Sequence, residues 1–165
     1  MRALCLFLSI LCLSPGMAFS AERAKVVVSM TRPLTTGCVL DAARVSGMPP
    51  AALFGLLATE GGSMGEALSN TNGTWDLGCF QINERAAMGI APETLLRDGC
   101  VNAYAAAWLL RKEYERTGDL WLAIGAYHSR TPHRRDAYIR KVRTNLEELR
   151  RRGISSLSSL QEAQP

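Results

Sequence analysis

Residues that bind metals are scarce in this chain. Its 165 residues include five cysteines and two histidines, no CxxC pair occurs, and neither histidine stands at metal-ligand spacing to a cysteine. A zinc site is therefore not expected, and nothing in the sequence calls for a cofactor. Aromatic residues make up 7% of the chain, hydrophobic residues 47% and charged residues 21%. This composition excludes collagen-like, coiled-coil and mostly disordered proteins, and the length favours a single domain.

Long hydrophobic runs are missing except at the N-terminus. Residues 3–13 are apolar apart from Ser9 and follow a positive start at Arg2; a Ser-Pro-Gly break and small residues suited to cleavage before Ala21 come next. The run is too short to span a bilayer, so residues 1–20 are predicted to be a secretory signal peptide, and the mature protein to be periplasmic. A buried N-terminal helix is the alternative. No other stretch approaches a membrane span, so no integral membrane segment is expected.

Export changes how the cysteines are interpreted. Cys5 and Cys12 leave with the signal peptide, and the mature chain keeps Cys38, Cys79 and Cys100. An oxidising compartment favours one disulfide and one spare thiol. The pair Cys38–Cys100 is favoured because both residues stand at the starts of predicted helices, and closing that loop contributes about 4 kcal/mol. Three free thiols are the alternative.

Positive charge is concentrated near the C-terminus. Residues 22–129 hold nine Lys and Arg against eleven Asp and Glu, whereas residues 130–152 hold nine against three. Such a stretch can attract nucleic acid, acidic lipid or an anionic cell-wall polymer. No aromatic residues interleave the arginines as stacking platforms, so a solvated face of an amphipathic helix is favoured and nucleic acid is not an expected partner.

Apolar periodicity and turn residues predict one mainly α-helical domain over residues 37–152. It follows a leader segment (21–36) with a β-prone run at 26–28, and a flexible tail (153–165) follows it. Residues 63–76 are polar and turn-rich, residues 78–83 form a short extended or turn segment, and brief helical pieces continue to residue 97. The predicted helices are 38–46, 51–60, 100–116, 120–128 and 134–152.

Glu60 is unusual for its position. It continues the i, i+3, i+4 stripe of Leu53, Leu56 and Leu57, so a carboxylate shares the core-facing side of a helix and stands at its C-terminal end. Burial and the helix dipole both disfavour the ionised form, so its pKa is expected to rise. A carboxyl that holds a proton near neutral pH can donate it to a leaving oxygen. An exposed glutamate at a frayed helix end is the alternative.

Two further clusters could bind a sugar. Gln81 and Asn83 share a face of an extended segment, and Gly78 permits close approach of the backbone. Their amides suit sugar hydroxyls and N-acetyl groups, although such residues are also common in turns. Tyr127 and His128 end a helix, where a buried tyrosine and a surface or capping histidine are the simpler interpretation.

Together these clusters resemble a known family. In their order and spacing they are similar to the lytic transglycosylase (SLT) catalytic domain. The motifs that carry the similarity are Glu60 at a helix end, the run Asn72-Gly-Thr-Trp-Asp-Leu-Gly-Cys-Phe-Gln-Ile-Asn83, Asn102 with Ala-Ala-Trp-Leu-Leu at 106–110, and Ala-Ile-Gly-Ala-Tyr-His at 123–128. The resemblance covers about residues 38–142. It is strongest to the small exported type that accompanies type IV conjugation and type III secretion machines.

The resemblance implies a lysozyme-like, all-α fold with at most a tiny β element near Gly78–Asn83. It implies cleavage of the β-1,4 bond between N-acetylmuramic acid and N-acetylglucosamine in peptidoglycan, with Glu60 as the acid and then as the base that helps the muramyl 6-hydroxyl to close a 1,6-anhydro ring. It also places Phe80, Gln81 and Asn83 in the sugar groove.

By the same resemblance, Tyr127 would lie beside Glu60 and orient either that carboxyl or an N-acetyl group of the substrate. His128 and Gly78 would contribute to substrate binding. Three positions depart from the family pattern. Gly61 replaces a serine, Cys79-Phe80 replaces Leu-Met, and His128 replaces an asparagine, which makes its contribution pH-dependent.

Two other functions fit the same residues. A lysozyme-type hydrolase would use Asp76 as a second carboxylate that activates water or attacks the sugar, although an aspartate after a turn is more simply a turn residue. A non-catalytic adaptor would bind glycan and recruit secretion or conjugation components through its basic helix. In each case peptidoglycan glycan strands are the expected partner.

Overall fold

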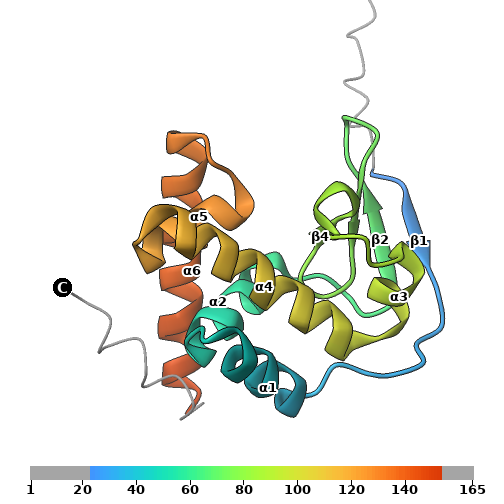
Figure 1. The fold of residues 1–165 in the computed structure, drawn as a ribbon, viewed down its shortest axis with the longest axis horizontal. Coiled ribbons are helices and arrows are strands. Elements are labelled where there is room, and N and C mark those ends of the chain that lie inside the picture. Colours follow the sequence, from blue (N-terminus) through green and yellow to red (C-terminus); the bar gives the residue numbers. More distant parts are fainter. Residues whose placement is uncertain (1–22, 154–165) are drawn as a thin grey trace, which may run out of the picture.

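The computed structural model describes residues 23–153, and Figure 1 shows their fold. The predicted signal peptide (1–20) and residues 154–165 of the predicted tail lie outside the described residues. Among the helices of residues 23–153, none combines the length and the apolar character needed to cross a membrane. The described helices are α1 Thr36–Ser46, α2 Pro50–Glu60, η1 Glu84–Ala86 (a short 3-10 helix), α3 Pro92–Arg97, α4 Gly99–Thr117, α5 Leu120–His128 and α6 Pro132–Arg151.

Local capping signals set the ends of these helices. α2 begins at Pro50, where a first turn tolerates proline, and it ends at Gly61, whose φ of 61° lies in the left-handed region. The Asp98 side chain accepts the backbone N–H groups of Cys100 and Val101 at the start of α4. Asp119 likewise caps α5 by accepting the Leu122 N–H at 2.7 Å. The mainly α-helical single domain is therefore confirmed.

The sheet is larger than the sequence predicted. Its four antiparallel strands follow the order β1 (Lys25–Val27), β2 (Glu66–Ser69), β3 (Trp75–Leu77) and β4 (Ile82–Asn83). β1 comes from the predicted leader and overlaps its β-prone run at 26–28. β2 and most of β3 come from the segment 63–76, predicted to be polar and turn-rich. Each strand has two to four residues, and none is buried along its whole length. Strands this short cannot show an alternating apolar pattern.

Close packing of α2 against α6 determines where the end of α2 lies. Leu53 and Leu56 of α2, and Val142 of α6, are fully buried. A Cβ atom at Gly55 would come within 2.9 Å of Val142 Cγ1, so the absence of a side chain allows the two helices to approach. This contact brings the C-terminal turn of α2 against the first half of α6.

A disulfide joins α1 to the first turn of α4. It links Cys38 to Cys100, the pairing favoured from the sequence, with 4.9 Å between their Cα atoms. Cys79 is a buried free thiol whose pKa is raised by burial. In Figure 1 the long helices gather on one side of the molecule, and the sheet and α3 lie on the other.

Candidate active site

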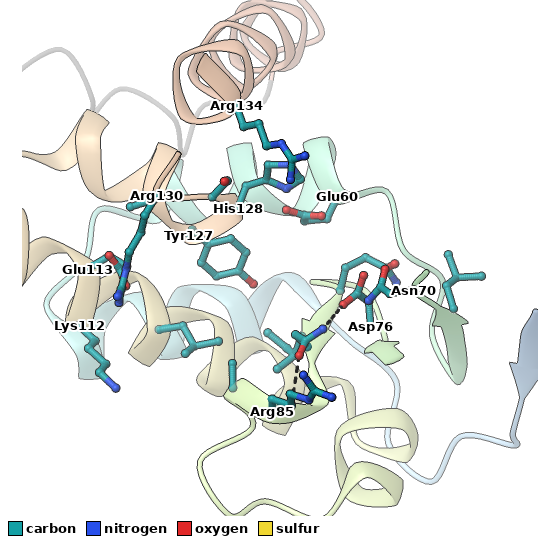
Figure 2. Close-up of a pocket in the computed structure, with 18 of the residues that line it drawn as sticks. Glu60, Asn70, Asp76, Arg85, Lys112, Glu113, Tyr127, His128, Arg130 and Arg134 are labelled. Atoms are coloured by element: carbon teal, nitrogen blue, oxygen red, sulfur yellow. Dashed lines mark hydrogen bonds and ion pairs between the residues drawn. The ribbon is translucent and has the colours of Figure 1, made fainter. Parts of the chain in front are cut away.

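A groove of about 980 Å³ lies between the helical side of the molecule and the sheet. One wall comes from the end of α2 and from α4, α5 and the start of α6; the other comes from β2, β3, β4 and η1. Figure 2 shows Glu60 and Asp76 on opposite walls, with Tyr127 and His128 beside Glu60. Of the residues predicted from the sequence to form a site, Glu60, Gln81, Asn83, Tyr127 and His128 all line the groove.

The Glu60 carboxyl is held by a tyrosine that the sequence analysis did not identify. The Tyr138 hydroxyl donates a hydrogen bond to Glu60 Oε1 at 2.6 Å. Burial raises the pKa of Glu60 to about 7; the Tyr138 bond and Lys141 oppose this rise, and the negative charge of Asp76 adds to it. Near neutral pH the group therefore exchanges readily between acid and base, as general acid–base chemistry requires.

Tyr138 is buried in α6, and its own pKa is raised by burial and by Glu60, so its hydroxyl remains a donor. On its ring lies the imidazole of His128, with the two ring centres 4.6 Å apart and the planes 3° from parallel. The position of Tyr138 one helical turn before the buried Val142 is the sequence signal that could have found it.

His128 is exposed at the end of α5 and lines the groove. Partial burial, together with the positive charges of Lys141 and Arg134, lowers its pKa, while Asp76 opposes the change. The imidazole is therefore predominantly neutral at neutral pH, and it can donate or accept a hydrogen bond there.

Tyr127 lies beside Glu60 but does not hydrogen-bond to it. Its hydroxyl donates to the backbone carbonyl of Phe80 at 2.9 Å, so it holds the β3–β4 turn against α5. Among the described residues it is therefore Tyr138, and not Tyr127, whose hydroxyl donates a hydrogen bond to Glu60. Burial and the nearby charge of Glu60 raise the pKa of Tyr127.

Two residues predicted to bind substrate do not face the groove. Phe80 is fully buried, so its side chain cannot contact a sugar. Gly78 is buried too, with a φ of 67°, and a Cβ atom there would lie 2.7 Å from Asn102 Nδ2. These two residues build the turn: its tight backbone leaves no room for a side chain at Gly78 and directs Phe80 into the core.

Asn102 is the buried anchor of this turn. From α4 its side chain accepts the Phe80 N–H at 3.0 Å and donates to the Leu77 carbonyl at 2.9 Å. Only 1% of Asn102 is exposed, so these bonds satisfy polar groups that water does not reach. The asparagine in the α4 motif therefore positions the opposite wall of the groove and does not contact substrate.

Gln81 and Asn83 line the groove near this turn. Gln81 has a left-handed φ of 48°, and its side-chain nitrogen donates to the Gly78 carbonyl at 2.9 Å. Asn83 donates to Asp76 Oδ1 at 2.9 Å. The other oxygen of Asp76 forms an ion pair with Arg23 at 3.2 Å. Both Asp76 oxygens thus have partners, whereas Glu60 is paired only through Oε1 among the described residues.

The position after Glu60 has room for a side chain. No atom lies within 4 Å of where a Cβ of Gly61 would stand, so the space beside this residue is open. The serine that the family usually carries would fit, but Gly61 adopts its left-handed conformation with less strain.

The chain is similar to a known family and to several curated proteins. A family model described as the transglycosylase SLT domain matches residues 37–148. Two curated Escherichia coli proteins, each named X polypeptide, are 39% identical to the chain over 67 residues, which is 37% of this chain and 40% of theirs. An X polypeptide of Escherichia coli strain K12 is 42% identical over 48 residues, 29% of this chain and 28% of its own. The matched stretch therefore spans less than half the length of these relatives.

Proposed function

Because this chain belongs to the transglycosylase SLT domain family, we propose that it is a peptidoglycan lytic transglycosylase with Glu60 as its catalytic acid and base. Members of the family are lyases that cleave peptidoglycan. The observation that carries the proposal is the position of Glu60 in the wall of a groove large enough for a glycan, where burial raises its pKa to about 7.

The reaction uses the two protonation states of Glu60 in turn. The protonated carboxyl donates its proton to the oxygen of the β-1,4 bond between N-acetylmuramic acid and N-acetylglucosamine, and the bond from that oxygen to the muramyl C1 breaks. The carboxylate then removes the proton of the muramyl 6-hydroxyl, whose oxygen bonds to C1 and closes a 1,6-anhydro ring. Glu60 recovers its proton in this second step, and no water is consumed.

The surroundings of Glu60 support this sequence. Tyr138 occupies Oε1, so the transferable proton is assigned to Oε2. On the opposite wall, Arg23 and Asn83 engage both oxygens of Asp76. A hydrolase would need a second carboxylate free to activate water or attack the sugar. The pairing of Asp76 therefore favours ring closure by the substrate over hydrolysis.

Substrate binding is assigned to the other polar groups that line the groove. The side chains of Gln81, Asn83 and His128 face the space where N-acetyl and hydroxyl groups would lie. Tyr127 forms the wall between Glu60 and this turn, and its hydroxyl stays with Phe80.

The cellular role follows from the substrate and from the predicted signal peptide. Peptidoglycan lies outside the cytoplasm, so the enzyme acts in the periplasm. There it opens the cell wall locally for an envelope-spanning conjugation or secretion apparatus, as its similarity to the small exported transglycosylases suggests. Complementation of a transfer or secretion defect by the parent protein, but not by Glu60→Gln, tests this role against that of a non-catalytic adaptor.

Digestion of purified sacculi tests the chemistry. The parent should release muropeptides with 1,6-anhydro ends, each one water lighter than a hydrolysed end, as read by chromatography and mass spectrometry. Glu60→Gln should release none, whereas the matched control Glu147→Gln, an exposed position on α6 outside the groove, should act as the parent does. Products with hydrolysed ends would contradict the proposal and identify the protein as a lysozyme-type hydrolase.

A further inference from the structure

The charges that line the groove are unbalanced. Apart from Glu60, its carboxylates are Asp76 and Glu113, and each has an arginine partner. Asp76 pairs with Arg23 at 3.2 Å, and Glu113 pairs with Arg130 at 2.6 Å. These two carboxylates are therefore neutralised within the protein.

The ion pair of Glu113 with Arg130 belongs to the wall of the groove. Glu113 is only 8% exposed, and a second arginine, Arg116, reaches its other oxygen at 2.8 Å. Although burial raises the pKa of Glu113, the hydrogen bonds from Arg130 and Arg116 hold it below the usual range. The carboxylate remains ionised and fixes Arg130 at the groove edge.

Three further cations line the groove without an acidic partner. They are Arg85 of η1, Lys112 of α4 and Arg134 of α6. Within residues 23–153, none of the three forms an ion pair or donates a side-chain hydrogen bond. Figure 2 shows them on three sides of the groove, with Arg134 near Glu60 and Lys112 at the other end. Their uncompensated charge faces the place where a glycan would lie.

An aromatic ring stands next to one of these cations. Trp108 lines the groove and is 46% exposed, and the Lys112 ammonium lies 5.2 Å from the centre of its ring. An exposed indole offers an apolar face to a sugar ring. The lysine beside it is then within reach of a substituent on that sugar, so the two side chains can recognise a charged sugar together.

We propose that the groove selects glycans whose sugars carry carboxylates, through Arg85, Lys112 and Arg134. This proposal rests on the proposed function and assigns the residues that recognise the charged groups of its substrate. N-acetylglucosamine is uncharged, so the carboxylates must come from the muramyl residues. Two sources share this chemistry: the carboxylate of the lactyl ether on a strand without peptides, and the carboxylates of attached peptide stems.

Binding measurements on a full-length Glu60→Gln background test the proposal, because this variant does not turn over its ligand. The three ligands are chitooligosaccharides, which are uncharged, glycan strands stripped of peptides, and strands that carry peptide stems. The test variant adds Arg85→Gln, Lys112→Gln and Arg134→Gln. The control adds Arg32→Gln, Arg140→Gln and Arg150→Gln, an equal change of charge at exposed positions outside the groove.

The test variant should bind carboxylate-bearing strands about 10-fold more weakly than its background, the sum expected of three exposed charge pairs. Its affinity for chitooligosaccharides should be unchanged, and the control should bind all ligands as the background does. If the test variant loses affinity for both kinds of strand, the cations bind the lactyl carboxylate. If it loses affinity only for strands that carry peptides, the cations bind the carboxylates of the peptide stems. Equal losses for all three ligands, equal losses in the control, or no loss would overturn the proposal. Failure of the proposed reaction is a separate result, seen when the parent enzyme releases no anhydro product.

Discussion

The Tyr138 hydroxyl lies 2.6 Å from Glu60 Oε1 and donates a hydrogen bond to it, although the two residues are 78 positions apart in the chain. This bond joins the end of α2 to α6 at the wall of the groove. His128 stacks on Tyr138, so one continuous set of side chains supports the carboxyl proposed to do the chemistry.

Tyr138→Phe removes a bond that lowers the pKa of Glu60. Burial then acts with less opposition, so the pKa of Glu60 should rise above about 7, and the alkaline limb of the activity profile should move to higher pH. The optimal rate should fall about 10-fold, because a charge-assisted hydrogen bond that orients the acid is lost. The measurement is kcat/KM on glycan strands between pH 5 and 9. Tyr104→Phe, at an exposed position of α4 outside the groove, is the control, and an unmoved alkaline limb in Tyr138→Phe would contradict the prediction.

Glu60 should make folding stability fall as the pH rises. Its pKa is about 7 in the folded protein against an ordinary value of 4.5, so the folded state holds a proton that the unfolded chain has released between these values. Stability is therefore lost across this window, by about 3 kcal/mol when the pH exceeds 7. Glu60→Gln lacks this penalty and should gain stability relative to the parent at pH 8, but much less at pH 4.5. Urea unfolding at pH 4.5 and pH 8 measures the free energy of unfolding of the parent and of Glu60→Gln. If the difference between the two proteins is the same at both pH values, Glu60 is not buried as described.

His128→Asn should leave activity near the parent level at pH 7.5. Burial, Lys141 and Arg134 lower the pKa of His128 below 6.5, so the imidazole is already mostly neutral there. As the pH falls through the pKa of His128, the imidazole of the parent gains a positive charge beside Tyr138. The asparagine of the variant does not. The acid limb of the activity profile should therefore be flatter in the variant. His133→Asn, at an exposed position of α6, should keep the parent profile; identical acid limbs in the parent and His128→Asn would remove this titration from the mechanism.

The disulfide should account for much of the stability of the domain. Cys38 and Cys100 are separated by 62 positions, and closing a loop of that length stabilises a protein by about 4 kcal/mol in the chain-entropy model. Cys38→Ser with Cys100→Ser should lower the free energy of unfolding by about this amount, as chemical denaturation would show. A reductant should then have no further effect on the double variant, whereas it should destabilise Cys79→Ala as much as the parent. Equal stability of the double variant and the parent would contradict the prediction.

Local sequence determined the helices and the position of Glu60. Gly47 and Gly61 end helices, and Asp98 and Asp119 cap them, through bonds that close within one turn. The apolar stripe of α2 places Glu60 on the side that faces the core. Each of these signals involves residues only a few positions apart, so the sequence alone was sufficient to predict the helix ends and the orientation of Glu60.

Tertiary structure decided which groups meet. The Tyr138–Glu60 bond depends on the packing of α2 against α6, and the pairing of β1 with β2 joins segments about 40 positions apart. The burial of Phe80 depends on Asn102, which binds its backbone from another helix. Periodicity reports which side of an element is apolar, but it does not report which distant element covers that side. For this reason the sequence indicated the acid, and only the fold showed the tyrosine that holds it and the cations that face it.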